Sequence, residues 1–216
     1  MRSERILVDG PVGVIETVFD YPAGFPPAGV SPTGAPPGTA RGLALVAHPH
    51  PLYGGTLDNK VAQILARTFA DLGYVSVRPN FRGVGASAGA HDEGNGETDD
   101  LVAVVAFARH KLGLPDQALV LAGFSFGSLV VARVAKRLTV ERMVFVGTAV
   151  TRGKVEDVPA DTVVIHGEND DTVPLGAVLR WAEAQELPVI VIPGADHFFH
   201  RRLHIIKGII TRAWKN

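Results

Sequence analysis

Apolar and polar positions follow two rhythms along the chain, and together they predict strands that alternate with helices. Short, largely apolar runs typical of buried strands occur at residues 43–47, 75–78, 118–122, 143–146, 162–165 and 189–192. Helical spacing of apolar residues occurs at 61–72, 101–108, 125–137, 174–187 and 200–214. This alternation indicates right-handed βαβ units in an α/β fold, with a mainly parallel sheet and helices on both faces.

The first part of the chain follows a different pattern. Residues 13–21 are rich in β-branched side chains and predict a strand that pairs with residues 6–8 as an antiparallel hairpin. Residues 22–38 hold six prolines and four glycines, which excludes regular structure and predicts a loop or an insertion. Because the residues before this loop are too few to form a core, we expect a single domain over residues 1–216.

The pentapeptide Gly123-Phe124-Ser125-Phe126-Gly127 matches the pattern G-x-S-x-G. It stands directly after the apolar run at 118–122 and directly before a helical pattern, which is the context in which this pattern carries chemical meaning. The turn is so tight that flanking side chains would collide, and glycine at both flanks removes the collision. Free N–H groups at the helix N-terminus favour developing negative charge beside the serine. We interpret Ser125 as a nucleophile.

Two other interpretations of this pentapeptide exist. It is compatible with a glycine-flanked turn in which the serine only caps the helix. A phosphate-binding loop is disfavoured, because the chain contains neither G-x-G-x-x-G nor the Gly-Lys-Ser/Thr ending of a P-loop.

A histidine and an acid should follow the serine in the order Ser, acid, His. His197 lies in a loop after the last predicted strand, where its imidazole can reach over the serine, and we expect it to be the base. His166 ends the preceding strand, a position more typical of packing or of loop orientation. His200 and His204 are expected on a helix surface, and since no carboxylate is spaced with these histidines as in helical zinc motifs, we expect no metal site.

The acid should follow the strand that ends near His166, where Asp170 and Asp171 are both available. Pro174 is expected in the first turn of the next helix, so that Asp171 or Thr172 could cap that helix. This leaves Asp170 to receive the imidazole N–H and to fix its tautomer. We favour Asp170, and Asp171 stays the alternative.

An oxyanion hole needs two backbone N–H donors. The first should be Phe126, the residue after the nucleophile, and the second should come from the loop at residues 48–55. Proline has no N–H, so the two prolines of this loop are eliminated. We favour the His50 N–H as the second donor, and the Leu52 N–H is the next candidate. The alternative is that this loop is a rigid proline-rich turn without a catalytic role.

Composition narrows the choice of function. The chain is 46% hydrophobic and 20% charged, as in globular proteins, and its formal net charge of −1 gives no basic field for nucleic acid or an anionic membrane. The absence of cysteine excludes a disulfide framework and a cysteine nucleophile. No signal peptide or membrane-spanning stretch is evident, so we expect a cytoplasmic enzyme without a cofactor.

From Gly42 onward the residues resemble a known family, the small uncapped α/β-hydrolases that include predicted hydrolases and carboxylesterases. In that family the matching positions imply Ser125 as nucleophile, Asp170 as acid and His197 as base. One motif departs from the wider α/β-hydrolase pattern D-x-x-G-x-G-x-S, because Asn80 stands where aspartate is common. The residues that carry the resemblance are His48-Pro49-His50-Pro51, Gly54-Gly55, Asn59-Lys60, Asn80 to Gly85, Ser87, Gly123 to Gly127, His166-Gly167-Glu168, Asp170 and Asp196 to His200.

The connection between the strands at 143–146 and 162–165 is too short for a helical cap, so we expect an α/β-hydrolase fold with a shallow, open pocket. Such a pocket favours small or short-chain acyl substrates, with carboxylic ester hydrolysis as the expected reaction. An amide, peptide or thioester hydrolase, a perhydrolase and a non-catalytic binding protein on the same fold are the alternatives. The residues expected to line the pocket are Leu52, Tyr53, Phe126, Phe198 and Phe199.

Overall fold

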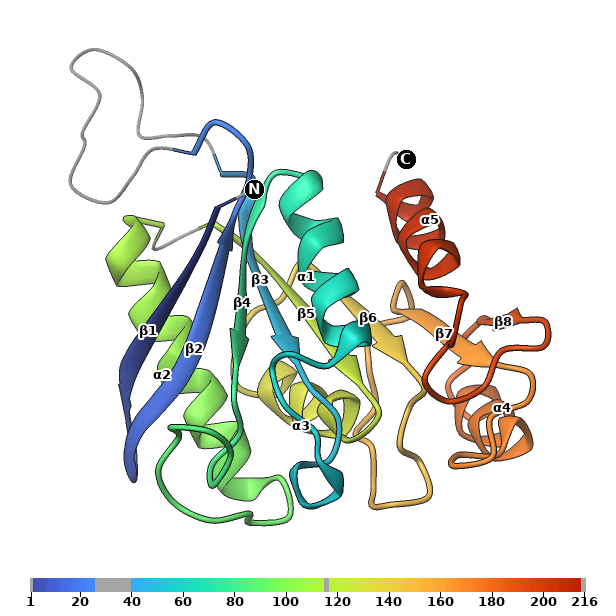
Figure 1. Cartoon of the computed structure of the whole chain (residues 1–216). Helices are drawn as coiled ribbons and strands as arrows, with labels where there is room; N and C mark the ends of the chain where they lie inside the picture. The colour runs from blue at the N-terminus through green and yellow to red at the C-terminus, as the bar shows by residue number, and fades with distance from the viewer. Residues whose placement is uncertain (1, 26–39, 115–116, 215–216) are drawn as a thin grey trace.

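One eight-stranded sheet forms the centre of the computed structural model, which describes residues 2–25, 40–114 and 117–214 (Figure 1). The strands are β1 (Arg2–Gly10), β2 (Gly13–Tyr21), β3 (Gly42–Ala47), β4 (Tyr74–Pro79), β5 (Ala118–Phe124), β6 (Arg142–Val146), β7 (Val163–Gly167) and β8 (Val189–Ile192). Their order in the sheet is β1-β2-β4-β3-β5-β6-β7-β8. The β1–β2 hairpin and the β2–β4 pair are antiparallel, and the other pairs are parallel. The predicted topology is confirmed.

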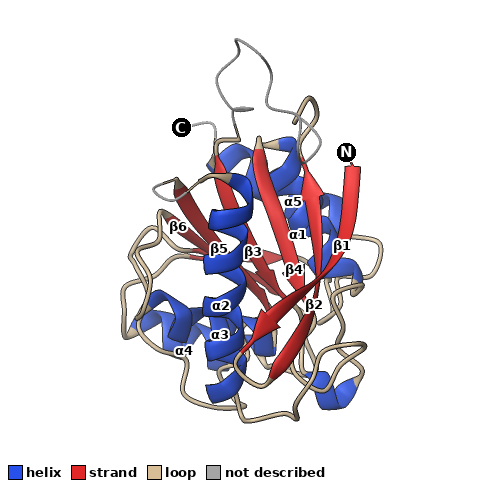
Figure 2. Ribbon diagram, turned by 90° about the vertical axis from the view of Figure 1, so that its left-hand side faces the viewer, coloured by secondary structure: helices blue, strands red, loops and turns tan. Residues whose placement is uncertain are grey.

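Helices cover both faces of the sheet, as predicted. They are α1 (Lys60–Asp71), α2 (Asn95–Leu112), α3 (Phe126–Ala135), α4 (Leu175–Glu183) and α5 (Leu203–Ala213). Successive residues of β3 face opposite sides: Leu43 and Leu45 belong to the core under α2 and α3, whereas Ala44 belongs to the core under α1 and α5. Figure 2 shows α2, α3 and α4 together in front of the sheet. Continuous apolar strands follow directly from burial on both faces.

Helix boundaries differ from the expected ones where backbone geometry overrides periodicity. α2 begins at Asn95 rather than near 101, because Gly94 has a φ of 86° and its N–H donates to the Glu97 carboxylate at 2.9 Å. α5 begins at Leu203 rather than at 200, since Phe199 and Arg201 have φ values of 52° and 61° that no α-helix contains.

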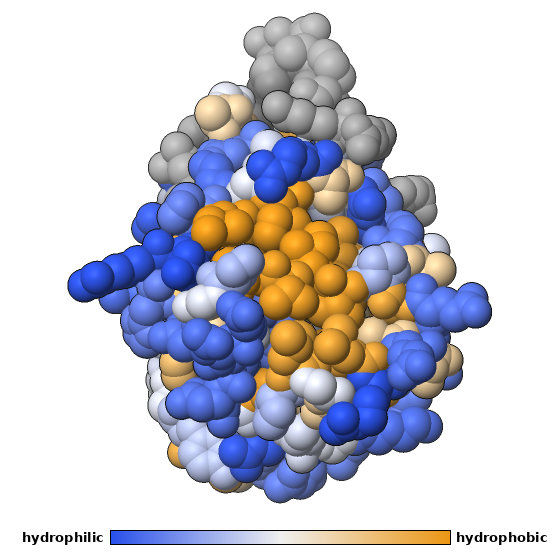
Figure 3. All heavy atoms as spheres, turned by 90° about the vertical axis from the view of Figure 1, so that its right-hand side faces the viewer, coloured by the Kyte–Doolittle hydropathy of each residue, from blue (hydrophilic) through white to orange (hydrophobic). Residues whose placement is uncertain are grey.

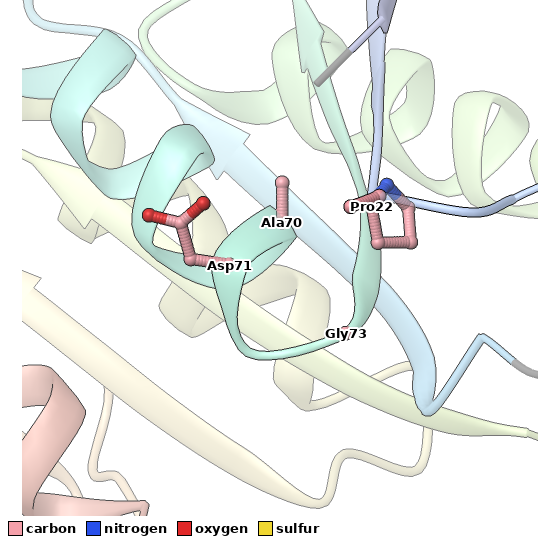
Figure 4. A pocket seen from close by; sticks show the side chains of 5 residues that line it. Pro22, Ala70, Asp71 and Gly73 are labelled. Carbon is pink, nitrogen blue, oxygen red and sulfur yellow. The ribbon is translucent and has the colours of Figure 1, made fainter.

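Only residues 22–25 of the proline- and glycine-rich segment are described; the rest of this predicted loop lies outside the described residues. A cavity of about 210 Å³ lies where that segment begins, against the carboxyl end of α1 (Figure 4). Pro22, Ala23, Ala70, Asp71 and Gly73 line it. None of the residues expected at the functional site contributes to this cavity.

The connection from β6 to β7, residues 147–162, contains no helix or strand, so no cap domain is inserted there, as predicted. In the described part of the chain, no helix is both long enough and apolar enough to cross a membrane.

β8 forms one edge of the sheet and, among the described residues, pairs with β7 alone. All four of its residues are apolar, and Ile190 is exposed. Figure 3 shows a broad apolar area on the side of the molecule where Figure 1 places β8 and α5. The chain thus leaves toward His197 from one of the two edge strands of the sheet.

The loops after β3 and β4 are held together by His48. Its Nε2 accepts a hydrogen bond from the Phe81 N–H at 2.9 Å, and its Nδ1 donates to the Pro49 carbonyl oxygen at 2.7 Å. The ring is fully buried, and this burial lowers the pKa of His48 to about 4, although the Pro49 hydrogen bond acts in the opposite direction. His48 is therefore neutral at pH 7 and joins the two loops as one hydrogen-bonding unit.

Replacing His48 should change how stability depends on pH. The unfolded chain protonates this histidine near pH 6.5 but the folded chain only near pH 4, so its contribution is complete above about pH 6.5 and is lost as the pH falls toward 4. In urea unfolding, the free energy of unfolding of the wild type should fall as the pH drops over this range. We expect this fall to exceed that of His48→Gln by on the order of 3 kcal/mol.

The control is His110→Gln, which alters an exposed histidine of α2 and should leave the wild-type pH dependence in place. An equally steep loss of stability in His48→Gln and in the wild type would contradict the assignment.

Candidate active site

Ser125 occupies the turn between β5 and α3 with φ 53° and ψ −120°, a strained conformation for a residue that carries a side chain. Neighbouring groups hold this turn. The Ser125 N–H donates to the Val146 carbonyl oxygen at 2.9 Å, and the Ser125 carbonyl oxygen accepts from the N–H and the Oγ of Ser128 at 2.9 and 2.6 Å. The serine side chain is thereby placed beyond the carboxyl end of a central strand.

The flanking glycines are needed because backbone atoms pass close to both. A Cβ at Gly123 would overlap the backbone nitrogen of Ser128, and a Cβ at Gly127 would overlap the carbonyl oxygen of Ala47. The collision expected from the pentapeptide is confirmed. Gly123 thus allows the end of β5 to approach α3, and Gly127 allows α3 to approach the end of β3.

His197 bridges Ser125 and Asp170. Its Nε2 lies 3.0 Å from the Ser125 Oγ, and its Nδ1 lies 2.7 Å from Oδ2 of Asp170. All three residues are buried, with exposed fractions of 8% or less. Gly147, which the sequence analysis did not single out, makes room for the imidazole, since a Cβ there would lie 3.2 Å from Cε1 of His197. The three predicted residues are thus brought together from loops far apart in sequence.

The Asp170 carboxylate is ionised and fixes the imidazole. Burial raises the pKa of Asp170, but hydrogen bonds from His197 and from the Val173 N–H outweigh it, and the net pKa lies below its ordinary value. An ionised carboxylate accepts from Nδ1–H, which leaves the lone pair of Nε2 directed at the hydroxyl of Ser125. This geometry suits proton transfer from the serine to the histidine.

Asp171 does not take part in this arrangement. It is exposed, and its Oδ1 accepts from the Thr172 hydroxyl at 3.4 Å. The expectation that Asp171 or Thr172 caps the following helix is wrong: Pro174 itself occupies the N-cap position of α4, and no side chain makes a capping hydrogen bond there. Asp170 instead orders this turn, because its Oδ1 accepts from the N–H groups of Thr172 and Val173 at 3.0 and 2.7 Å.

The two residues that carry the candidate oxyanion donors, His50 and Phe126, are in contact through their rings. Phe126 is the first residue of α3, so its N–H has no partner within the helix. The His50 ring contacts the Phe126 ring, with 4.7 Å between centroids. The Leu52 N–H already donates to the His50 Nδ1 at 3.3 Å, which favours His50 over Leu52 as the second donor. Both backbone donors stay predictions.

A pocket of about 230 Å³ opens in front of Ser125 and His197. Tyr53 and Phe198, both expected to line it, do so, with exposed fractions of 71% and 48%. The lining residues are Pro49, His50, Tyr53, Gly54, Gly55, Asn59, Ser125, Arg152, Thr172, His197 and Phe198.

Three other residues expected in the lining lie outside it. Leu52 is 69% exposed and projects from the short 3-10 turn Pro51–Tyr53, whereas Phe126 and Phe199 are buried in the two apolar cores. Phe199 adopts a positive φ that turns the chain after His197 into the core under α1 and α5. An aromatic residue beside a catalytic candidate is thus used here for packing.

Arg152, Asn59 and Thr172 line the pocket but were not predicted to do so. Each lies in a loop or at a helix cap, where hydrophobic periodicity gives no information on contacts. The available signal for Arg152 was its place in the short connection between β6 and β7, next to the expected site.

The other three histidines that follow Ser125 in the sequence, His166, His200 and His204, do not contact the Ser125 hydroxyl. Nε2 of His166 donates to the Val173 carbonyl oxygen at 2.8 Å, which orients the loop of Asp170 as expected for a packing histidine. His200 is an exposed residue whose Nδ1 lies 2.6 Å from Asp196 Oδ2, and His204 is exposed on α5. Among the residues described, no three His, Asp or Glu side chains are grouped to hold a metal ion.

Comparison with known proteins supports the same family. A family model described as the alpha/beta hydrolase fold matches residues 52–160, a stretch that includes Ser125 but not Asp170 or His197. The uncharacterized protein RP471 of Rickettsia prowazekii is 33% identical over 171 residues, which cover 73% of this chain and 71% of that protein.

Two solved structures are similar over nearly the whole chain. XC6422 from Xanthomonas campestris, described as an α/β serine hydrolase without a lid, is 36% identical, covers 100% of this chain and 94% of its own, and has a TM-score of 0.86. An α/β serine hydrolase homologue from Coxiella burnetii is 33% identical, with coverage of 98% and 97% and a TM-score of 0.80. The chain belongs to the α/β-hydrolase family, among its serine hydrolases without a lid.

Proposed function

We propose that the protein is a serine esterase that hydrolyses small or short-chain acyl substrates through Ser125, His197 and Asp170. The observation that carries this proposal is the pair of contacts, 3.0 Å from Ser125 Oγ to His197 Nε2 and 2.7 Å from His197 Nδ1 to Asp170, beside an open pocket. An activated serine in such a place serves nucleophilic acyl transfer.

The proposed mechanism has two halves. In the first, His197 takes the hydroxyl proton of Ser125 as the serine oxygen attacks the ester carbonyl, and the N–H groups of Phe126 and His50 stabilise the oxyanion. The intermediate collapses, His197 gives its proton to the leaving alcohol, and an acyl-serine remains. In the second half water attacks this ester with His197 as base, and the carboxylic acid leaves as Ser125 regains its proton.

The size and openness of the site favour short acyl groups. The pocket of about 230 Å³ is smaller than the range usual for drug-sized ligands, and the uncapped β6–β7 connection adds no apolar wall for a long chain. The apolar side chains of Pro49, Tyr53 and Phe198 in the lining offer a contact surface for an acetyl or butyryl group.

An active-site label should react with Ser125 alone. We expect a fluorophosphonate to add one adduct to the wild-type protein, located on Ser125 by intact mass and peptide mapping, because His197 activates that hydroxyl. Ser125→Ala should carry no adduct, whereas Ser3→Ala, which changes an exposed serine of β1, should label like the wild type. A folded wild-type protein without an adduct would contradict the proposal and favour a binding function.

The neighbouring aspartates provide a matched pair of variants. Asp170→Asn should lower kcat for p-nitrophenyl acetate by about 10⁴, because the amide leaves His197 in the wrong tautomer. Asp171→Asn should keep kcat within about twofold, since its side chain is exposed and does not contact His197. Equal losses in the two variants would reject Asp170 as the acid.

The value of kcat/KM should depend on the length of the acyl chain. We expect kcat/KM to be higher for p-nitrophenyl acetate and butyrate than for the octanoate and palmitate esters, because a longer chain extends beyond the pocket into water. A series of these esters, measured below their micelle-forming concentrations, tests this directly. Faster turnover of the two longer esters would overturn the short-chain assignment.

A further inference from the structure

Arg152 is a charged residue of the pocket that the proposed mechanism does not use. It lies on the β6–β7 connection and lines the same pocket as Ser125 and His197. Its guanidinium carbon lies 5.3 Å from the ring centroid of Tyr53, a contact that holds the cation at the pocket. None of the ion pairs found among the described residues includes Arg152. An exposed guanidinium in this position is available to a ligand.

The pocket lining itself contains no negatively charged side chain, since no aspartate or glutamate is among the lining residues. Two helices begin there, since Asn59 is the N-cap of α1 and Ser125 is the N-cap of α3, and a helix N-terminus carries partial positive charge. Three acids lie close to lining residues without belonging to the lining: Asp170 is bonded to His197, Glu93 lies 3.6 Å from His91, and Asp171 is exposed and accepts from the Thr172 hydroxyl.

His50, on the same rim, does not supply a second cation. Burial lowers the pKa of His50, and the charges of His91 and Arg152 act in the same direction, against those of Glu93 and Glu97. Arg152 is therefore the one permanently charged side chain of the pocket lining.

We propose that Arg152 binds a carboxylate of the substrate, so that the protein acts preferentially on small esters that carry a carboxylic acid group. This inference rests on the proposed esterase function. The two parallel N–H donors of one guanidinium match one carboxylate, whereas a phosphate dianion would call for a second cation, which the pocket lining lacks. A pocket of about 230 Å³ has room for a short acid beside the scissile ester.

Two pairs of esters test this preference on both sides of the scissile bond. The mono-p-nitrophenyl ester of adipic acid carries the carboxylate on the acyl side, and p-acetoxybenzoate carries it on the leaving group. The methyl ester of each compound is its uncharged partner. The measured quantity is the ratio of kcat/KM for the charged ester to that for its uncharged partner, so that intrinsic reactivity is compared within one pair.

Arg152→Met keeps an unbranched apolar side chain near Tyr53 and removes the charge. We expect this variant to lower the ratio by about tenfold or more in at least one pair, mainly through KM, because a charge-assisted hydrogen bond is lost. Added salt should lower the ratio of the wild type but not that of the variant.

Lys154→Met is the matched control. It removes a positive charge from an exposed residue of the same connection, outside the lining, and should leave the wild-type ratio unchanged. An unchanged ratio in Arg152→Met for both pairs would overturn the inference while the esterase activity stands.

Binding of p-acetoxybenzoate to Ser125→Ala, followed by NMR titration, separates this inference from the proposed reaction. We expect the added Arg152→Met substitution to weaken this binding by about tenfold. If the wild type hydrolysed no ester and took no fluorophosphonate, this binding result would support the carboxylate site while the esterase function would be rejected. Equal binding with and without Arg152 would reject the carboxylate site.

Discussion

The backbone of Ser125 lies in a region that costs on the order of 1–3 kcal/mol, and the surrounding structure must hold it there. Strand β5 is central in the sheet. Directly after it, the Ser125 N–H donates a hydrogen bond to the carbonyl oxygen of Val146 at the end of β6. Helix α3 follows at once and comes so close that only glycine fits at positions 123 and 127. This constraint on one turn determines where β3, β6 and α3 can lie, and therefore where the loops that carry Asp170 and His197 end.

Buried polar contacts hold the remaining loops around that turn. Asn80, which stands where related sequences often have aspartate, donates from Nδ2 to the Glu16 carboxylate at 2.7 Å and accepts from the Leu57 N–H at 2.8 Å. A carboxylate at position 80 could not donate to Glu16, so the asparagine and the glutamate form a matched pair. Nearby, Arg82 forms a bidentate ion pair with Asp100 of α2, at 2.8 Å for both contacts.

Much of the fold could be predicted from sequence because the central parallel strands are buried on both faces and leave apolar runs, while turns such as the one at Ser125 require glycine at fixed offsets. The order of the residues and the strands that they follow predicted His197 near Ser125 and favoured Asp170, although they left Asp171 as the alternative acid. Contacts between loops that are distant in sequence produce no pattern of apolar residues from which they could be predicted. The space that Gly147 gives to His197 and the approach of Arg152 to Tyr53 depend on how loops fold back on the sheet. The start of α5 was misplaced because positive φ values at Phe199 and Arg201 have no hydrophobic signature.

The position of β8 has a consequence for how activity is lost under stress. His197 follows a four-residue edge strand that, within the described ranges, pairs with β7 alone, whereas Ser125 follows β5 in the middle of the sheet. Edge elements open locally at a lower free energy than central ones. We therefore expect heat or denaturant to separate the imidazole from the serine while most of the sheet is still folded. Inactivation is then expected to precede unfolding and to reverse on cooling, as long as the released apolar strand has not paired with that of another molecule.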